Sequence, residues 1–132
     1  KSGFTEYHAE KLRELKFTLS LNLLNWTESI EKLLKENVTA IIAPSDREAW
    51  MIYGWLSTVG FQLPKDISLL SFDNNINEVS AKITSVDFGF GFLGYAAAHI
   101  FGNTLPVKQD RHGNIEAQPY IVDRGSVGIA KS

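Results

Sequence analysis

Two apolar stretches of this 132-residue chain each end in side chains that can bind a small polar molecule. Residues 67–72 lead directly into Asp73 and Asn74, and residues 38–43 lead through Pro44 into Ser45 and Asp46. Carboxylate, amide and hydroxyl groups at such positions can form hydrogen bonds with a ligand. The same residue types also cap turns and helices, and this structural role is the alternative interpretation.

Both stretches have the composition of buried β-strands. Residues 67–72 do not alternate strictly between apolar and polar, which suits a strand covered on both faces, and residues 38–43 are rich in β-branched side chains. A helix that is apolar nearly all round is predicted between them, over residues 46–59, ending at Gly60. Upstream, the pattern predicts a helix over 4–15, a strand over 17–21 and a helix from 27 to 35.

This alternation of helices and strands predicts an α/β fold, with a parallel sheet flanked by helices on both faces. Open α/β sheets bind ligands beyond the carboxyl ends of their strands, where Asp73 and Asp46 would lie. The last third predicts a short strand at 83–86, a Gly-rich and Ala-rich apolar helix at 88–101, a polar loop at 103–114 and a strand at 120–122.

Gly89, Gly91 and Gly94 fit the G-x-G-x-x-G pattern of dinucleotide sites, and they lie between a predicted strand and a predicted helix. That pattern needs an acidic residue at a strand end about 20 residues further on, and here this distance falls in the polar loop. The motif also normally opens the first βα unit of its domain. We therefore interpret these glycines as hinge or close-packing positions, and a dinucleotide-dependent enzyme remains the less favoured alternative.

The composition gives no sign of nucleic-acid binding, a metal site or membrane insertion. The 13 basic and 15 acidic residues leave no cationic surface for nucleic acid, so contact with DNA would need another part of the protein. The chain has no cysteine, and its three histidines are scattered, so neither a metal site nor a cofactor is predicted. Residues 1–6 lack the apolar core of a signal peptide, and no segment approaches the ~18 apolar residues of a membrane span.

From Val38 onward, the sequence resembles the effector-binding domain of the lactose-repressor/galactose-repressor family of bacterial regulators. Residues 60–74, GFQLPKDISLLSFDN, are similar to the family signature Gly-Leu-x-Val-Pro-x-Asp-Ile-Ser-Val-Val-Gly-Phe-Asp-Asp. Residues 38–46 resemble the family strand that ends in Asn-Asp, and the segments 83–86, 93–97 and 122–126 resemble later landmarks in the same order. Residues 1–37 match more loosely.

The resemblance implies one lobe of a type I periplasmic-binding-protein-like fold. Residues 1–87 and 115–132 would form the C-terminal lobe, and the helix within 88–103 would belong to an N-terminal lobe that lies outside this chain, as would the DNA-binding domain. That helix would then lack its natural cover. We expect it to fold back onto its own domain or to dock against another copy.

The resemblance also implies roles for individual residues. Asp73 would accept hydrogen bonds from paired hydroxyls of a sugar or related metabolite, and an aromatic ring would stack on the ligand. Two departures from the family affect ligand identity, because Ser45 stands where the family has Asn and Ser71 stands where it has Gly. The ligand-binding residues expected on this basis are Asp73, Ser45, Asp46, Trp26, Phe88 and Phe90.

The function expected is that of the ligand-sensing domain of a cytoplasmic transcription regulator, which is a homodimer and contacts DNA through a domain outside this chain. By position, Trp50 and Tyr53 on the apolar helix would lie at the dimer interface. A secreted sugar-binding protein of a transport system shares the fold and is the alternative. A helix-turn-helix encoded upstream would favour the regulator, and a signal peptide would favour transport.

Overall fold

The structure, a computed structural model, describes residues 26–75, 82–104 and 108–129. The chain divides into two compact units, residues 1–36 and residues 37–132. In the first unit, helix α2 (Trp26–Lys35) has an acidic residue in its first turn, two basic residues in its last turn and a buried Ile30. Those charges favour the helix, because each lies near the opposite pole of its dipole. The helix predicted at 4–15 and the strand predicted at 17–21 lie outside the described residues.

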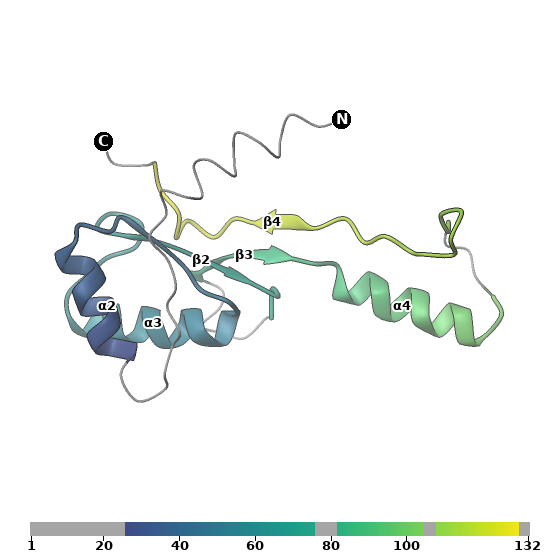
Figure 1. Cartoon of the computed structure of the whole chain (residues 1–132), viewed down its shortest axis with the longest axis horizontal. Coiled ribbons are helices and arrows are strands. Elements are labelled where there is room, and N and C mark those ends of the chain that lie inside the picture. Colours follow the sequence, from purple (N-terminus) through teal and green to yellow (C-terminus); the bar gives the residue numbers. More distant parts are fainter. Residues whose placement is uncertain (1–25, 76–81, 105–107, 130–132) are drawn as a thin grey trace. The chain divides into compact units, whose positions relative to one another are not determined.

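The second unit is built on a four-stranded sheet with the order β1-β2-β3-β4, of which Figure 1 labels β2, β3 and β4. The strands are β1 (Ala40–Ile42), β2 (Ser68–Phe72), β3 (Thr84–Asp87) and β4 (Tyr120–Val122). Strands β1, β2 and β3 run parallel, as predicted. Strand β4 pairs antiparallel with β3, with Tyr120 opposite Asp87, so the sheet is mixed and not wholly parallel. The chain returns from α4 to the carboxyl end of β3 and therefore enters β4 from that end (Figure 1).

Helix α3 (Asp46–Thr58) packs against β2 through one buried stripe. Its stripe residues Ala49, Ile52 and Leu56 are spaced by three and four positions, as one face of a helix requires. They join Ile41, Ala43, Ile67, Leu69 and Ile83 in the buried core. On the opposite face of the sheet, Ile42 is 66% exposed, so the cover expected on both faces is incomplete at β1.

Helix α4 (Phe90–Phe101) begins at Gly89, whose φ of 74° lies in the left-handed region that favours glycine. A Cβ at this position would stand 3.1 Å from the Ala117 Cβ, so the return segment also approaches the chain closely here. The helix continues beyond the end of β3 (Figure 1), and its terminal Phe101 is 94% exposed. The helix does not fold back over the sheet (Figure 1), and docking against another copy stays a prediction.

Candidate ligand-binding site

The three parallel strands end side by side, and each end carries an acidic side chain. Asp46 follows β1, Asp73 follows β2, and Asp87 is the last residue of β3. We call this end of the sheet the carboxyl edge. The order β1-β2-β3 brings the three strand ends together, as expected for a parallel sheet.

Asp73 has the geometry of a ligand-binding side chain. Its backbone N–H continues the sheet ladder by donating to Val86 O at 2.9 Å, while its φ of 91° turns the chain sharply at the edge. The residue is half-buried, and its carboxylate has no hydrogen-bond partner among the residues that the structure describes. A partly desolvated carboxylate without a protein partner there can accept hydrogen bonds from a ligand.

Aromatic rings lie at the carboxyl edge, where Phe72 ends β2 and Phe88 follows β3. Phe72 stacks on Phe88 with ring centroids 5.7 Å apart and planes 6° apart, and Phe88 meets Phe90 edge-on at 5.9 Å. Phe88 is 39% exposed and Phe90 is 55% exposed. Exposed aromatic faces next to a hydrogen-bonding carboxylate can bind a molecule that has both an apolar face and hydroxyl groups, such as a sugar ring.

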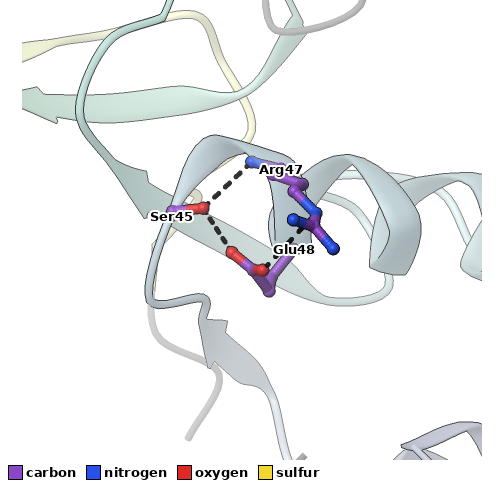
Figure 2. A network of polar contacts seen from close by, with 3 residues as sticks. All are labelled: Ser45, Arg47 and Glu48. Atoms are coloured by element: carbon purple, nitrogen blue, oxygen red, sulfur yellow. Dashed lines mark hydrogen bonds and ion pairs between the residues drawn. The ribbon is translucent and has the colours of Figure 1, made fainter. Parts of the chain in front are cut away.

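Ser45 is the N-cap of helix α3 (Figure 2). Its hydroxyl accepts a hydrogen bond from the Arg47 backbone N–H at 3.2 Å and donates one to the Glu48 carboxylate. Arg47 Nε also lies 3.9 Å from Glu48 Oε1. The helix cap therefore already engages the hydroxyl that was predicted to contact a ligand, and a ligand contact by Ser45 stays a prediction.

Asp46 lies beneath the edge and is only 3% exposed. Its Oδ1 accepts hydrogen bonds from the hydroxyls of Ser71 and Ser85, the latter at 2.9 Å, and its Oδ2 accepts from the Asn75 backbone N–H at 2.6 Å. Asp46 was also predicted as a ligand contact. Its two oxygens are instead bonded within the protein, so its direct contact with a ligand stays a prediction.

A second polar network joins the strand ends to the segments that lead to and from α4. The Asp87 carboxylate accepts hydrogen bonds from Asn74 Nδ2 at 2.8 Å, from the Gly89 N–H at 2.6 Å and from the Tyr120 hydroxyl at 2.9 Å. These bonds, that from Asn74 above all, hold the pKa of Asp87 below its ordinary value. The same carboxylate raises the pKa of Tyr120, through the hydrogen bond and through its charge.

Arg124 completes this network from the segment after β4. Its guanidinium donates to Asn74 Oδ1 and, at 2.9 Å, to Ile83 O. Sequence reasoning placed Asn74 at a strand end and Arg124 in a landmark segment, but it assigned no partner to either. The residue type of Asn74 was the one signal present, because a side-chain amide can accept a hydrogen bond from a cation and donate one to a carboxylate.

The glycine motif has a different role from phosphate binding in this structure. The Gly89 N–H at the start of α4 already donates to the Asp87 carboxylate. A dinucleotide pyrophosphate would need such N–H groups and would meet a negative charge beside them. The positive φ of Gly89 and the close approach of the Ala117 Cβ suit its interpretation as a hinge or close-packing position.

The other predicted residues lie away from this cluster or in the other unit. Trp26 is the first residue of α2 in the first unit, so its place at the edge stays a prediction. On α3, Trp50 is 49% exposed and Tyr53 is half-buried, as a surface that receives a partner would require, but dimerisation itself stays a prediction. In the described ranges no group of histidine and acidic residues could hold a metal ion. None of the helices in these ranges has the length and apolar character of a membrane span.

Comparison with known proteins places this geometry in a family. Residues 3–127 match the periplasmic binding protein-like domain. The HTH-type transcriptional repressor PurR of Klebsiella pneumoniae is 30% identical over 91 residues, which are 67% of this chain and 27% of PurR. The chain thus spans about a quarter of the length of this curated relative.

Two solved structures share the fold. A LacI-family transcriptional regulatory protein from Corynebacterium glutamicum is 27% identical, with a TM-score of 0.57 over 73% of this chain and 38% of that protein. A LacI-family regulator from Burkholderia phymatum has a TM-score of 0.58 at 20% identity, over 74% of this chain and 37% of that protein. The chain therefore belongs to the periplasmic-binding-protein-like domain family, in the form found in LacI-family transcriptional regulators.

Proposed function

We propose that this chain is the effector-sensing part of a bacterial transcription regulator and that it binds a sugar or a related small polar metabolite at the carboxyl edge. One observation carries the proposal: the half-buried Asp73 carboxylate lies without a partner among the described residues, at the same sheet edge as two exposed phenylalanine rings. Binding of this kind needs no catalytic group. The family relatives, which are transcriptional regulators, support the same assignment.

In this proposal, Asp73 accepts hydrogen bonds from adjacent ligand hydroxyls, and Phe88 and Phe90 contact the apolar face of the ring. Ser45 completes the pocket by sharing its hydroxyl between the ligand and the helix cap. Each of these side chains lies within three residues of the end of a parallel strand. Such placement on rigid elements holds the polar groups in a fixed geometry for recognition.

The rest of the binding site belongs to an N-terminal lobe encoded outside residues 1–132. The apolar surface of α4 supports this proposal, because Phe90, Tyr95 and Ile100 are each at least 50% exposed and Phe101 is almost fully exposed. A soluble protein rarely leaves a continuous apolar surface of this kind in water. We propose that α4 packs in that second lobe and that the effector is enclosed between the two lobes.

The complete regulator acts in the cytoplasm as a homodimer, with Trp50 and Tyr53 of α3 at the interface and DNA bound through a separate domain. An effector changes DNA affinity only if it binds two arrangements of the lobes unequally. By reciprocity, DNA must then change effector affinity by the same factor. The proposal therefore predicts a coupling that can be measured in both directions.

The test uses the full-length regulator and an operator duplex selected from a random DNA pool. Fluorescence anisotropy would give the DNA affinity with and without D-glucose, D-galactose, cellobiose, D-ribose or hypoxanthine. We expect one class of compound to change the DNA affinity by about 5-fold to 150-fold, the usual range of allosteric coupling. Specific DNA binding that no small molecule alters would contradict effector sensing. Tight sugar binding with no selected DNA sequence would favour the transport protein.

A further inference from the structure

The turn after β2, residues 73–75, is held by three successive backbone N–H groups. In chain order these groups donate to Val86 O at 2.9 Å, to Ser85 Oγ at 3.1 Å and to Asp46 Oδ2 at 2.6 Å. One bond continues the sheet, and the other two end on side chains beneath the edge. The position of the turn therefore depends on those side chains.

The turn needs this support because its backbone is unusual. Asp73 has a φ of 91° and Asn74 a φ of 50°, both in the region that side chains other than glycine rarely adopt. Such conformations persist where the surrounding structure determines them, and they cluster at ligand sites. The three hydrogen bonds to the turn hold it in this conformation.

Asp46 controls two of the three bonds. Its Oδ2 binds the third N–H of the turn directly, and its Oδ1 accepts from the Ser85 hydroxyl at 2.9 Å. The Ser85 hydroxyl in turn accepts from the Asn74 N–H, so it connects the Asp46 carboxylate to the second N–H of the turn. Ser71, the register partner of Ser85 on β2, donates to the same Oδ1, and both serines are fully buried. No water reaches these hydroxyls, so the carboxylate is the main acceptor for both; Ser71 Oγ also lies 3.4 Å from Thr84 O.

We propose that Asp46 is a positioning residue of the effector site: it fixes the turn 73–75 so that the Asp73 carboxylate points to the ligand. This inference rests on the proposed function and assigns Asp46 a role other than ligand contact. Ser71 strengthens the arrangement as an additional donor to Asp46. The buried carboxylate thereby links β1, β2 and β3 to the geometry of one binding group.

The test variant is Asp46→Asn in the full-length regulator. A carboxamide presents one oxygen and one NH₂ group, so it leaves either the serine hydroxyls or the Asn75 N–H facing another donor. Asp66→Asn is the matched control, because the Asp66 carboxylate also accepts from a backbone N–H, that of Gln62 at 2.8 Å. Asp66 lies just before the start of β2, whereas Asp46 lies after the end of β1, at the carboxyl edge. Both variants lose one negative charge from a carboxylate that caps a backbone N–H.

The first measurement is amide hydrogen exchange at residues 74 and 75, which needs no ligand. We expect exchange to be at least about tenfold faster in Asp46→Asn and unchanged in Asp66→Asn, as for loss of roughly one hydrogen bond to a charged group. Unchanged exchange in Asp46→Asn would overturn the proposal. If that variant does not fold, Ser85→Ala serves instead, and it should accelerate exchange at residue 74 more than at residue 75. Equal acceleration at both residues, or none, would overturn the connection through Ser85.

The second measurement is the affinity for D-glucose, D-galactose and cellobiose by calorimetry. At a temperature at which both variants are fully folded, we expect Asp46→Asn to weaken binding at least about tenfold, whereas Asp66→Asn should bind as the wild type does. Faster exchange with unchanged affinity would overturn the positioning role. If the wild-type protein binds none of these sugars, the sugar assignment of the proposed function fails, and the exchange result still decides whether Asp46 fixes the turn.

Discussion

Ser126→Ala tests how the sheet is held at the end opposite the candidate site. The Ser126 hydroxyl is 1% exposed, donates to Leu69 O of β2 at 2.5 Å and accepts from the Thr84 N–H of β3 at 2.8 Å. Alanine removes both bonds and leaves the buried Thr84 N–H without an acceptor. The lost bond contributes about 1 kcal/mol and the unsatisfied N–H costs about 1 to 3 kcal/mol, so we expect a destabilisation of about 2 to 4 kcal/mol.

Urea unfolding of the chain, followed by tryptophan fluorescence, would measure this change in the free energy of unfolding. Ser57→Ala is the matched control, because the Ser57 hydroxyl also donates to a backbone carbonyl, Tyr53 O at 2.8 Å, but on the exposed surface of α3. We expect this control to change stability by no more than about 0.5 kcal/mol. A loss below about 1 kcal/mol for Ser126→Ala would refute the reasoning, because it would mean that the Thr84 N–H finds another acceptor.

Three further predictions follow from single residues. In the same urea assay, Gly89→Ala should destabilise the chain by about 1 to 2 kcal/mol, because the φ of Gly89 is positive. Gly91→Ala should instead stabilise the chain by up to about 1 kcal/mol, because Gly91 lies within α4 and an added Cβ would meet nothing within 4 Å. The lowered pKa of Asp87 predicts a contribution to stability that is present above the ordinary aspartate pKa and is lost as the pH falls through the folded-state pKa. The raised pKa of Tyr120 predicts a contribution to stability that is lost as the pH rises through its folded-state pKa. Tyr120→Phe should remove that alkaline loss of stability from the pH profile. Trp50→Ala should weaken dimerisation of the full-length regulator by about 1.5 to 3 kcal/mol in sedimentation equilibrium, and an unchanged dimer constant would exclude Trp50 from the interface.

The sequence predicted the parallel strands and the two helices of the second unit well, because their signals are local. The apolar run before Asp73 produces β2, and Gly60 with a φ of 88° marks the end of α3, as expected. The direction of β4 was not predictable in this way. It depends on where the chain re-enters the sheet after α4, and no local pattern in residues 120–122 encodes that point.

The candidate site was predictable in part. A polar residue that ends a buried strand must leave the core, so Asp73 at the edge followed from its position. The partners of the other polar residues lie far away in the sequence, as for Asn74 with Arg124, 50 positions apart, and Asp87 with Tyr120, 33 positions apart. Ser71 within an apolar strand indicated a buried acceptor, but the sequence alone did not identify Asp46 as that acceptor.

The central claim, that the Asp73 carboxylate binds the effector, is tested most directly by calorimetry on the full-length regulator. Asp73→Ala is compared with Asp110→Ala, which removes an equal charge from an exposed loop whose hydrogen bonds are local. We predict that Asp73→Ala weakens effector affinity at least about tenfold, or 1.4 kcal/mol, while Asp110→Ala binds as the wild type does. Equal affinity in the wild type and Asp73→Ala would contradict the account, because the Asp73 carboxylate would then have no part in binding.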